Sequence, residues 1–113
     1  VCVDDFGLHS GINAAVLDAL GPQGFLVNVD SGRLVNEADL TAALTAGRIA
    51  GAGLDVFVDE PRVPLALRQS EHVTLQAHRA SATWETRTAM AQMVLDSVNQ
   101  ALAGERPAMS LTT

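Results

Sequence analysis

The sequence predicts an α/β fold in which parallel strands are covered by helices. Two observations carry this prediction. Strand-like and helical segments alternate along the 113 residues, and the strand-like segments are apolar throughout instead of alternating with polar residues. Strands that are apolar on both faces are typical of parallel sheets, whose connections cross over through helices. We therefore expect three or four parallel strands, flanking helices and a long C-terminal helix.

Two helices and a strand are predicted in the first half of the chain. Apolar residues recur at helical spacing over residues 12–20, and Gly21-Pro22 ends this helix. Residues 25–29 form a short apolar run, which indicates a buried strand. Asn36 is a favourable N-cap for the next helix, which Gly47 ends. The buried face of that helix is predicted to be Leu40, Ala43 and Leu44.

Two further strands and the long helix are predicted in the second half. Residues 49–56 form an apolar strand, in which Gly51 and Gly53 indicate close approach of neighbouring chains. Residues 72–76 form the next strand, and a helix follows over residues 83–103. The apolar face of this last helix consists of Met90, Met93, Val94, Val98, Ala101 and Leu102.

Composition excludes several classes of function. Seven basic residues, all arginine, stand against 13 acidic ones, for a net charge of −6. An acidic chain without lysine is a poor match for nucleic acid or anionic lipid. The one cysteine, Cys2, allows no internal disulfide and no cysteine-based metal site, and we expect it to be a small buried residue of an N-terminal strand. With no long apolar run, we expect a soluble, cytoplasmic protein without a membrane span.

Polar residues gather where the predicted strands end. Asp30-Ser31, residues 55–60 and His78 each follow a strand, and parallel sheets bind ligands beyond the carboxyl ends of their strands. A lone histidine is more often a structural or surface residue. A histidine beside a glutamate at this edge is different, because the carboxylate stabilises the imidazolium and suits it to general acid–base catalysis.

Three segments carry a resemblance to a known family. They read LVNVDSGRLVNE (residues 26–37), GRIAGAGLDVFVDEP (47–61) and HRASAT (78–83). Together they resemble the D-isomer-specific 2-hydroxyacid dehydrogenases, and HRASAT followed by Glu85-Thr86-Arg87 is most similar to the hydroxypyruvate/glyoxylate reductase branch. The resemblance implies that residues 1–113 are the C-terminal portion of an NAD-binding domain, a partial Rossmann-like fold.

The resemblance also implies an activity and roles for individual residues. Such enzymes transfer a hydride between NAD or NADP and a small 2-hydroxy or 2-oxo acid. His78 matches the catalytic proton donor, Glu60 the carboxylate that raises its pKa, and Asp55 the residue that contacts the nicotinamide amide. The other positions that match cofactor contacts, besides His78 itself, are Val29, Asp30, Ser31, Arg79, Ala80 and Ser81.

The chain departs from the family pattern at the position of the catalytic arginine. Ser31 stands there, preceded by Asp30 where a small residue is usual, and Arg33 is the nearest residue that could partly substitute. Serine cannot replace the charged, bidentate guanidinium fork. The 113 residues also contain no Gly-x-Gly-x-x-Gly phosphate turn and no substrate-binding domain. We therefore expect an incomplete dehydrogenase that is inactive by itself.

A second class of function stays open. An incomplete parallel sheet leaves one edge unpaired, and the apolar face of the long helix lacks a partner. The chain is then a non-catalytic interaction or dimerisation module, which pairs with a second copy or with a full-length relative. A chain with no selected role is the third alternative.

Overall fold

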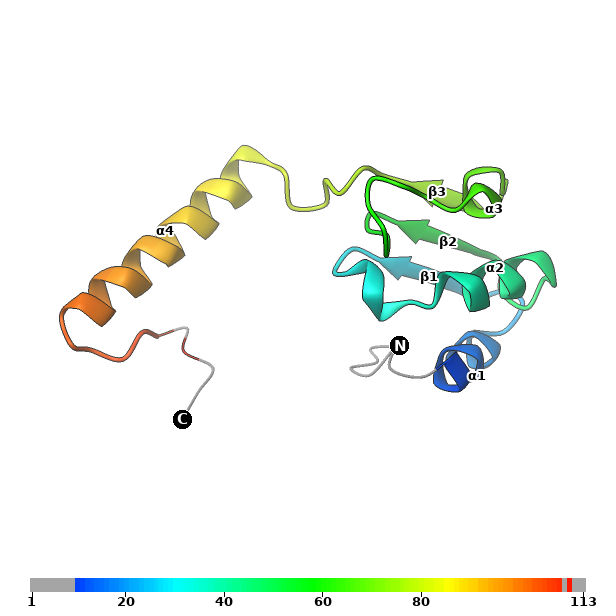
Figure 1. Ribbon diagram of the computed structural model, residues 1–113, viewed down its shortest axis with the longest axis horizontal. Coiled ribbons are helices and arrows are strands. Elements are labelled where there is room, and N and C mark those ends of the chain that lie inside the picture. The colour runs from blue at the N-terminus through cyan, green and yellow to red at the C-terminus, as the bar shows by residue number, and fades with distance from the viewer. Residues whose placement is uncertain (1–9, 109, 111–113) are drawn as a thin grey trace. The chain divides into compact units, whose positions relative to one another are not determined.

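The computed structural model describes residues 10–108 and 110, which fall into two compact units, Val1–His78 and Arg79–Thr113 (Figure 1). Cys2, predicted to lie in an N-terminal strand, is outside the described residues. The elements in chain order are α1 (Ser10–Leu20), β1 (Phe25–Asn28), the 3₁₀ helix η1 (Gly32–Leu34), α2 (Glu37–Thr45), β2 (Gly51–Leu54), α3 (Leu65–Arg68), β3 (Val73–Leu75) and α4 (Trp84–Leu102).

The three strands of the first unit form one parallel sheet, which confirms the predicted parallel arrangement, and their order is β1-β2-β3. The predicted strand boundaries were too wide. The first strand ends at Asn28 and not at Val29, and residues 49–56 and 72–76 contain strands of only four and three residues. Just beyond these limits neighbouring strand ends still share single backbone bonds, such as that from the Gln76 N–H to the Leu54 carbonyl at 2.9 Å, whereas the N–H of Asp30 bonds to the Asn28 side chain.

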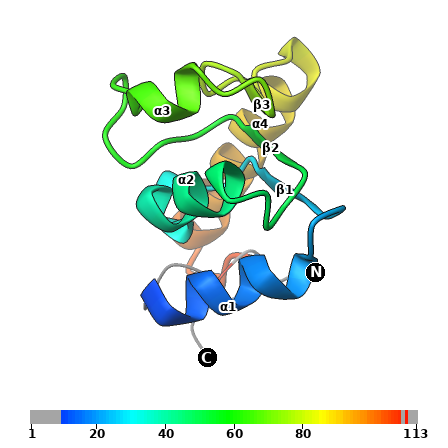
Figure 2. The same ribbon diagram turned by 90° about the vertical axis from the view of Figure 1, so that its right-hand side faces the viewer.

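One hydrophobic core joins the sheet to the helices of the first unit. Leu17 of α1, Leu40 of α2 and Leu67 of α3 are its largest fully buried side chains. The sheet contributes Ala52 and Leu54 from its central strand. Figure 2 shows α2 and α3 on one side of the strands, as crossover helices of a parallel sheet must lie.

The opposite face of the sheet is open to solvent in this unit. Phe25 and Val27 of β1 are each 69% exposed, and Thr74 of β3 is exposed as well. Gly51 lies close to its neighbours, since a Cβ there would meet the His72 carbonyl oxygen at 2.6 Å. The same expectation for Gly53 was wrong, because a Cβ there would be in ordinary contact with Val27.

The predicted helix ends are confirmed where the capping groups are described. Asn36 accepts hydrogen bonds from the N–H groups of Ala38 (3.0 Å) and Asp39 (3.1 Å) and so fixes the start of α2. Gly47, with φ of 65°, follows the end of that helix in the left-handed conformation that glycine adopts without strain. Leu40, Ala43 and Leu44 form its buried face as expected.

The second unit consists mainly of α4. Thr83 caps this helix by accepting the N–H of Thr86 at 3.2 Å. None of the side chains of α4 is buried, and Met90 and Val94 are 54% and 63% exposed. Across the part of the chain that the structure describes, no helix is both long enough and apolar enough to span a membrane.

Candidate functional site

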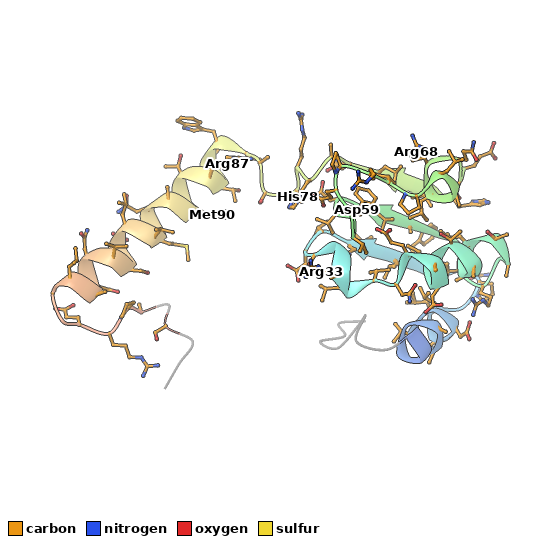
Figure 3. The ribbon with its side chains drawn as sticks, in the orientation of Figure 1. Arg33, Asp59, Arg68, His78, Arg87 and Met90 are labelled. Atoms are coloured by element: carbon orange, nitrogen blue, oxygen red, sulfur yellow. The ribbon has the colours of Figure 1, made fainter. Side chains whose placement is uncertain are left out.

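The candidate site lies at the carboxyl ends of the three strands. Asp55, directly after β2, links its two neighbours through its backbone: its N–H donates to the Asn28 carbonyl (3.0 Å), and its own carbonyl accepts the N–H of His78 (2.9 Å). The side chain of Asp55 is among the few buried charged groups, at 3% exposure. Figure 3 shows His78 and Asp59 at this same end of the sheet.

His78 and Glu60, eighteen residues apart, are in direct contact. The Nδ1 atom of His78 lies 2.8 Å from Oε2 of Glu60, and the other carboxylate oxygen of Glu60 accepts the N–H of Phe57 at 3.0 Å. His78 has a φ of 54°, which is uncommon for a residue other than glycine. Such backbone conformations persist where surrounding bonds fix them, here the bond from the His78 N–H to Asp55. The contact with Glu60 engages Nδ1 of the imidazole, so Nε2 is the ring nitrogen that points away from Glu60.

The contact shifts the pKa values of both groups. The hydrogen bond to Glu60, and then the charges of Glu60 and Asp55, raise the pKa of His78 above its ordinary value of 6.5. The bonds from His78 and from the Phe57 N–H lower the pKa of Glu60 below its ordinary 4.5. The imidazole therefore keeps its proton to a higher pH than an isolated histidine, as a general acid near neutral pH requires.

These shifts predict how His78 titrates. In the folded chain its NMR titration midpoint will lie above the ordinary value, and Glu60→Gln will bring the midpoint down because the carboxylate is lost. The contact stabilises the fold fully between about pH 4.5 and 6.5. Its contribution disappears as the pH rises through the folded pKa of His78, and again as the pH falls through that of Glu60. An unchanged midpoint in Glu60→Gln would contradict this electrostatic account.

Asn28 is a site residue that the sequence reasoning missed. Its side chain is buried and closes the loop after β1: Nδ2 donates to the Ser31 carbonyl (2.8 Å), and Oδ1 accepts the N–H of Asp30 (3.2 Å). Asparagine favours such turns because its amide bonds to the backbone two residues on. The sequence did contain a signal for this role, because Asn28 is the one polar residue in the apolar run of residues 25–29.

The other predicted site residues fall into two groups. Val29 and Asp30 are exposed and Ser31 is half-buried, all on the loop that Asn28 closes. Residues 79–81 open the second unit, where they are exposed and the Ala82 N–H bonds back to the Arg79 carbonyl at 3.0 Å.

Arg33, the residue nearest to the position of the missing arginine, belongs to η1. It lines a shallow hollow, together with Val35, Asn36, Glu37 and Val58.

The residues of this site fit one end of a nicotinamide cofactor. A buried carboxylate at the carboxyl ends of parallel strands, that of Asp55, is a suitable acceptor for an amide N–H group. The phosphate groups of such a cofactor have no matching Gly-x-Gly-x-x-Gly turn within the 113 residues. In the described ranges, no three histidine, cysteine or acidic side chains gather as a metal site would need.

The sequence matches the family profile of the D-isomer specific 2-hydroxyacid dehydrogenase NAD binding domain over residues 8–80. The chain belongs to this family, and its fold is part of an NAD-binding Rossmann-like domain. A 2-ketogluconate reductase of Gluconobacter oxydans is 54% identical over 87 residues, which cover 77% of this chain and 28% of the relative. A glyoxylate/hydroxypyruvate reductase of Arabidopsis thaliana is 45% identical over 94 residues, with coverages of 83% and 30%.

A solved structure with a similar fold contains a bound cofactor. The NADPH-dependent glyoxylate/hydroxypyruvate reductase of Sinorhizobium meliloti, in complex with NADP and malonate, is 47% identical with a TM-score of 0.74. The match covers 88% of this chain and 30% of the reductase. The chain thus spans about 30% of the length of these relatives.

Proposed function

We propose that this chain is the nicotinamide-side part of an NAD(P)-dependent dehydrogenase that interconverts 2-oxo and 2-hydroxy acids, of the glyoxylate/hydroxypyruvate type. The observation that carries the proposal is the 2.8 Å contact between His78 and Glu60 at the carboxyl ends of parallel strands. Membership of the family and the identities of 45–54% to the reductases support the same assignment.

In the proposed reaction, His78 is the proton donor. NADH or NADPH, when bound, would supply the hydride for the carbonyl carbon of the 2-oxo acid. The carbonyl oxygen takes its proton from Nε2 of His78, so that a 2-hydroxy acid is formed and the imidazole becomes neutral. Glu60 holds Nδ1 and favours the protonated imidazole before transfer. Asp55 would hold the nicotinamide by accepting a hydrogen bond from its amide.

Ser31 limits this chemistry. An arginine at this position would bind the substrate carboxylate with two parallel charged hydrogen bonds, and serine offers one neutral donor. The Asp30 carboxylate beside it repels an anionic substrate. We therefore propose that the residues of this chain leave the transition state without a cationic group to bind the substrate carboxylate.

A steady-state assay tests the proposal that these 113 residues alone do not catalyse the reaction. The 113-residue polypeptide, mixed with NADH or NADPH and with glyoxylate or hydroxypyruvate, is expected to oxidise the cofactor no faster than buffer does. The reasons are Ser31 and the missing phosphate turn. Sustained, enzyme-dependent cofactor oxidation would overturn the proposal of an inactive part.

The exposed apolar surfaces favour a second candidate, a non-catalytic module that pairs with a second copy or a full-length relative. Phe25 and Val27 leave one sheet face uncovered in the first unit, and Met90 and Val94 are exposed in the second. Retention of a tagged full-length dehydrogenase by this chain, lost in Val27→Asp, would support pairing. A monomer that retains no dehydrogenase would exclude it.

A further inference from the structure

Two carboxylates bind successive backbone N–H groups in the loop that carries Glu60. The N–H of Phe57 donates to Oε1 of Glu60 at 3.0 Å, and the N–H of Val58 donates to Oε1 of Glu37 at 2.9 Å. Glu37 is twenty-one residues earlier in the chain. The catalytic interpretation uses Glu60 and leaves Glu37 without a role.

Glu37 is attached to a rigid support. It is the first residue of α2, whose start is fixed by the Asn36 cap and whose next turn is anchored by the fully buried Leu40. The carbonyl of Glu37 also accepts the hydroxyl of Thr41 at 2.7 Å. Because the backbone of Glu37 is held by the helix and by the core, the bond from its carboxylate ties the loop at Val58 to the start of α2.

The bond to Val58 acts on Glu60 through one residue of backbone. Each oxygen of the Glu60 carboxylate has one partner, the Phe57 N–H on Oε1 and the His78 imidazole on Oε2. The Phe57 N–H belongs to the peptide just before the one that carries the Val58 N–H, so a displacement of the loop backbone at these two residues would move the Phe57 N–H away from Oε1 and release one side of the carboxylate. The Val58–Glu37 bond ties this backbone to the start of α2 and opposes that displacement.

We propose that Glu37 is a positioning residue for the His78–Glu60 pair, which it acts on by fixing the Phe57–Val58 backbone that holds the Glu60 carboxylate. The inference rests on the proposed function, in which that pair transfers the proton. The charges that raise the pKa of His78 are those of Glu60 and Asp55, so the proposed action of Glu37 is through the backbone.

An NMR titration of His78 in the full 113-residue chain tests this role without any need for turnover. Glu37→Ala is expected to remove most of the upward displacement of the His78 midpoint, since Glu60 loses its fixed orientation. Glu37→Gln keeps an acceptor oxygen at the same reach and is expected to retain the displacement. Asp39→Ala, which removes the other acidic side chain of the first turn of α2, is the matched control and is expected to leave the midpoint unchanged.

Amide hydrogen exchange separates positioning from general stability. Exchange of the Phe57 and Val58 amides should become at least about tenfold faster in Glu37→Ala than in Glu37→Gln, after correction for global unfolding. If Glu60→Gln lowers the His78 midpoint and Glu37→Ala does not, the positioning role proposed for Glu37 is wrong, while the proposed His78–Glu60 pair is still supported. If Glu60→Gln itself has no effect, the pair and the proposed function fail together.

Discussion

Replacement of Gly32 by alanine is expected to destabilise the first unit by about 3 kcal/mol, close to the upper end of the usual cost of overpacking. Gly32 is buried, and a Cβ built on it would overlap the carbonyl carbon and oxygen of Phe57 and lie 2.6 Å from the nitrogen of Val58. The backbone it would push away is the segment that Glu60 and Glu37 hold through hydrogen bonds. Urea unfolding followed by far-ultraviolet circular dichroism measures the change in the free energy of unfolding.

Gly47→Ala is the matched control for this prediction. Gly47 has a φ of 65°, but nothing lies within 4 Å of a Cβ placed there. Only the left-handed backbone is penalised, at a cost of about 1 kcal/mol. An equal or smaller loss in Gly32→Ala than in Gly47→Ala would show that the loop before Glu60 is not packed against Gly32.

Much of the fold could be predicted because it depends on local patterns. Continuous apolar runs identified the parallel strands, and Asn36 identified the start of α2 through a capping preference that acts over three residues. The exact strand ends could not be predicted, because Val29 is as apolar as the residues before it. What ends β1 is the amide side chain of Asn28, which draws the following backbone into a turn.

The candidate site was predicted in part, for a physical reason. Parallel strands bring their carboxyl ends to one edge, so Asp55, Glu60 and His78 could be expected there from the order of elements alone. The role of Glu37 could not be predicted. Its bond to Val58 joins residues far apart in the chain, and it depends on the path of a loop that leaves no periodic signal in the sequence. A glutamate at the start of a helix already has an adequate explanation in the helix dipole.

The second large effect concerns Ser31. A chimera would place residues 8–80 of this chain, the segment that matches the family profile, into the 2-ketogluconate reductase of Gluconobacter oxydans in place of its own segment. The host reductase then supplies the rest of the enzyme, which residues 8–80 of this chain do not contain. Within the chimera, Ser31→Arg is expected to raise kcat/KM for 2-ketogluconate by at least about 10²-fold, the usual worth of a donor directed at developing negative charge.

Ser31→Lys is the control that separates charge from shape. Lysine supplies a positive charge without the planar fork that binds a carboxylate through two bonds, so its gain should be clearly smaller than that of arginine. Circular dichroism and thermal unfolding establish that all three chimeras fold alike. A lysine gain equal to that of arginine would show that position 31 acts through charge alone.

The most direct test of the central claim is therefore one ratio, kcat/KM of the Ser31→Arg chimera divided by kcat/KM of the unsubstituted chimera. The central claim is that His78 and Glu60 form a competent acid–base pair, and that the chimera lacks only the arginine that would bind the substrate carboxylate at position 31. It predicts a ratio of about 10² or more, with a pH profile that follows the raised pKa of His78. A ratio near one, whether both folded chimeras are active or both inactive, would contradict it.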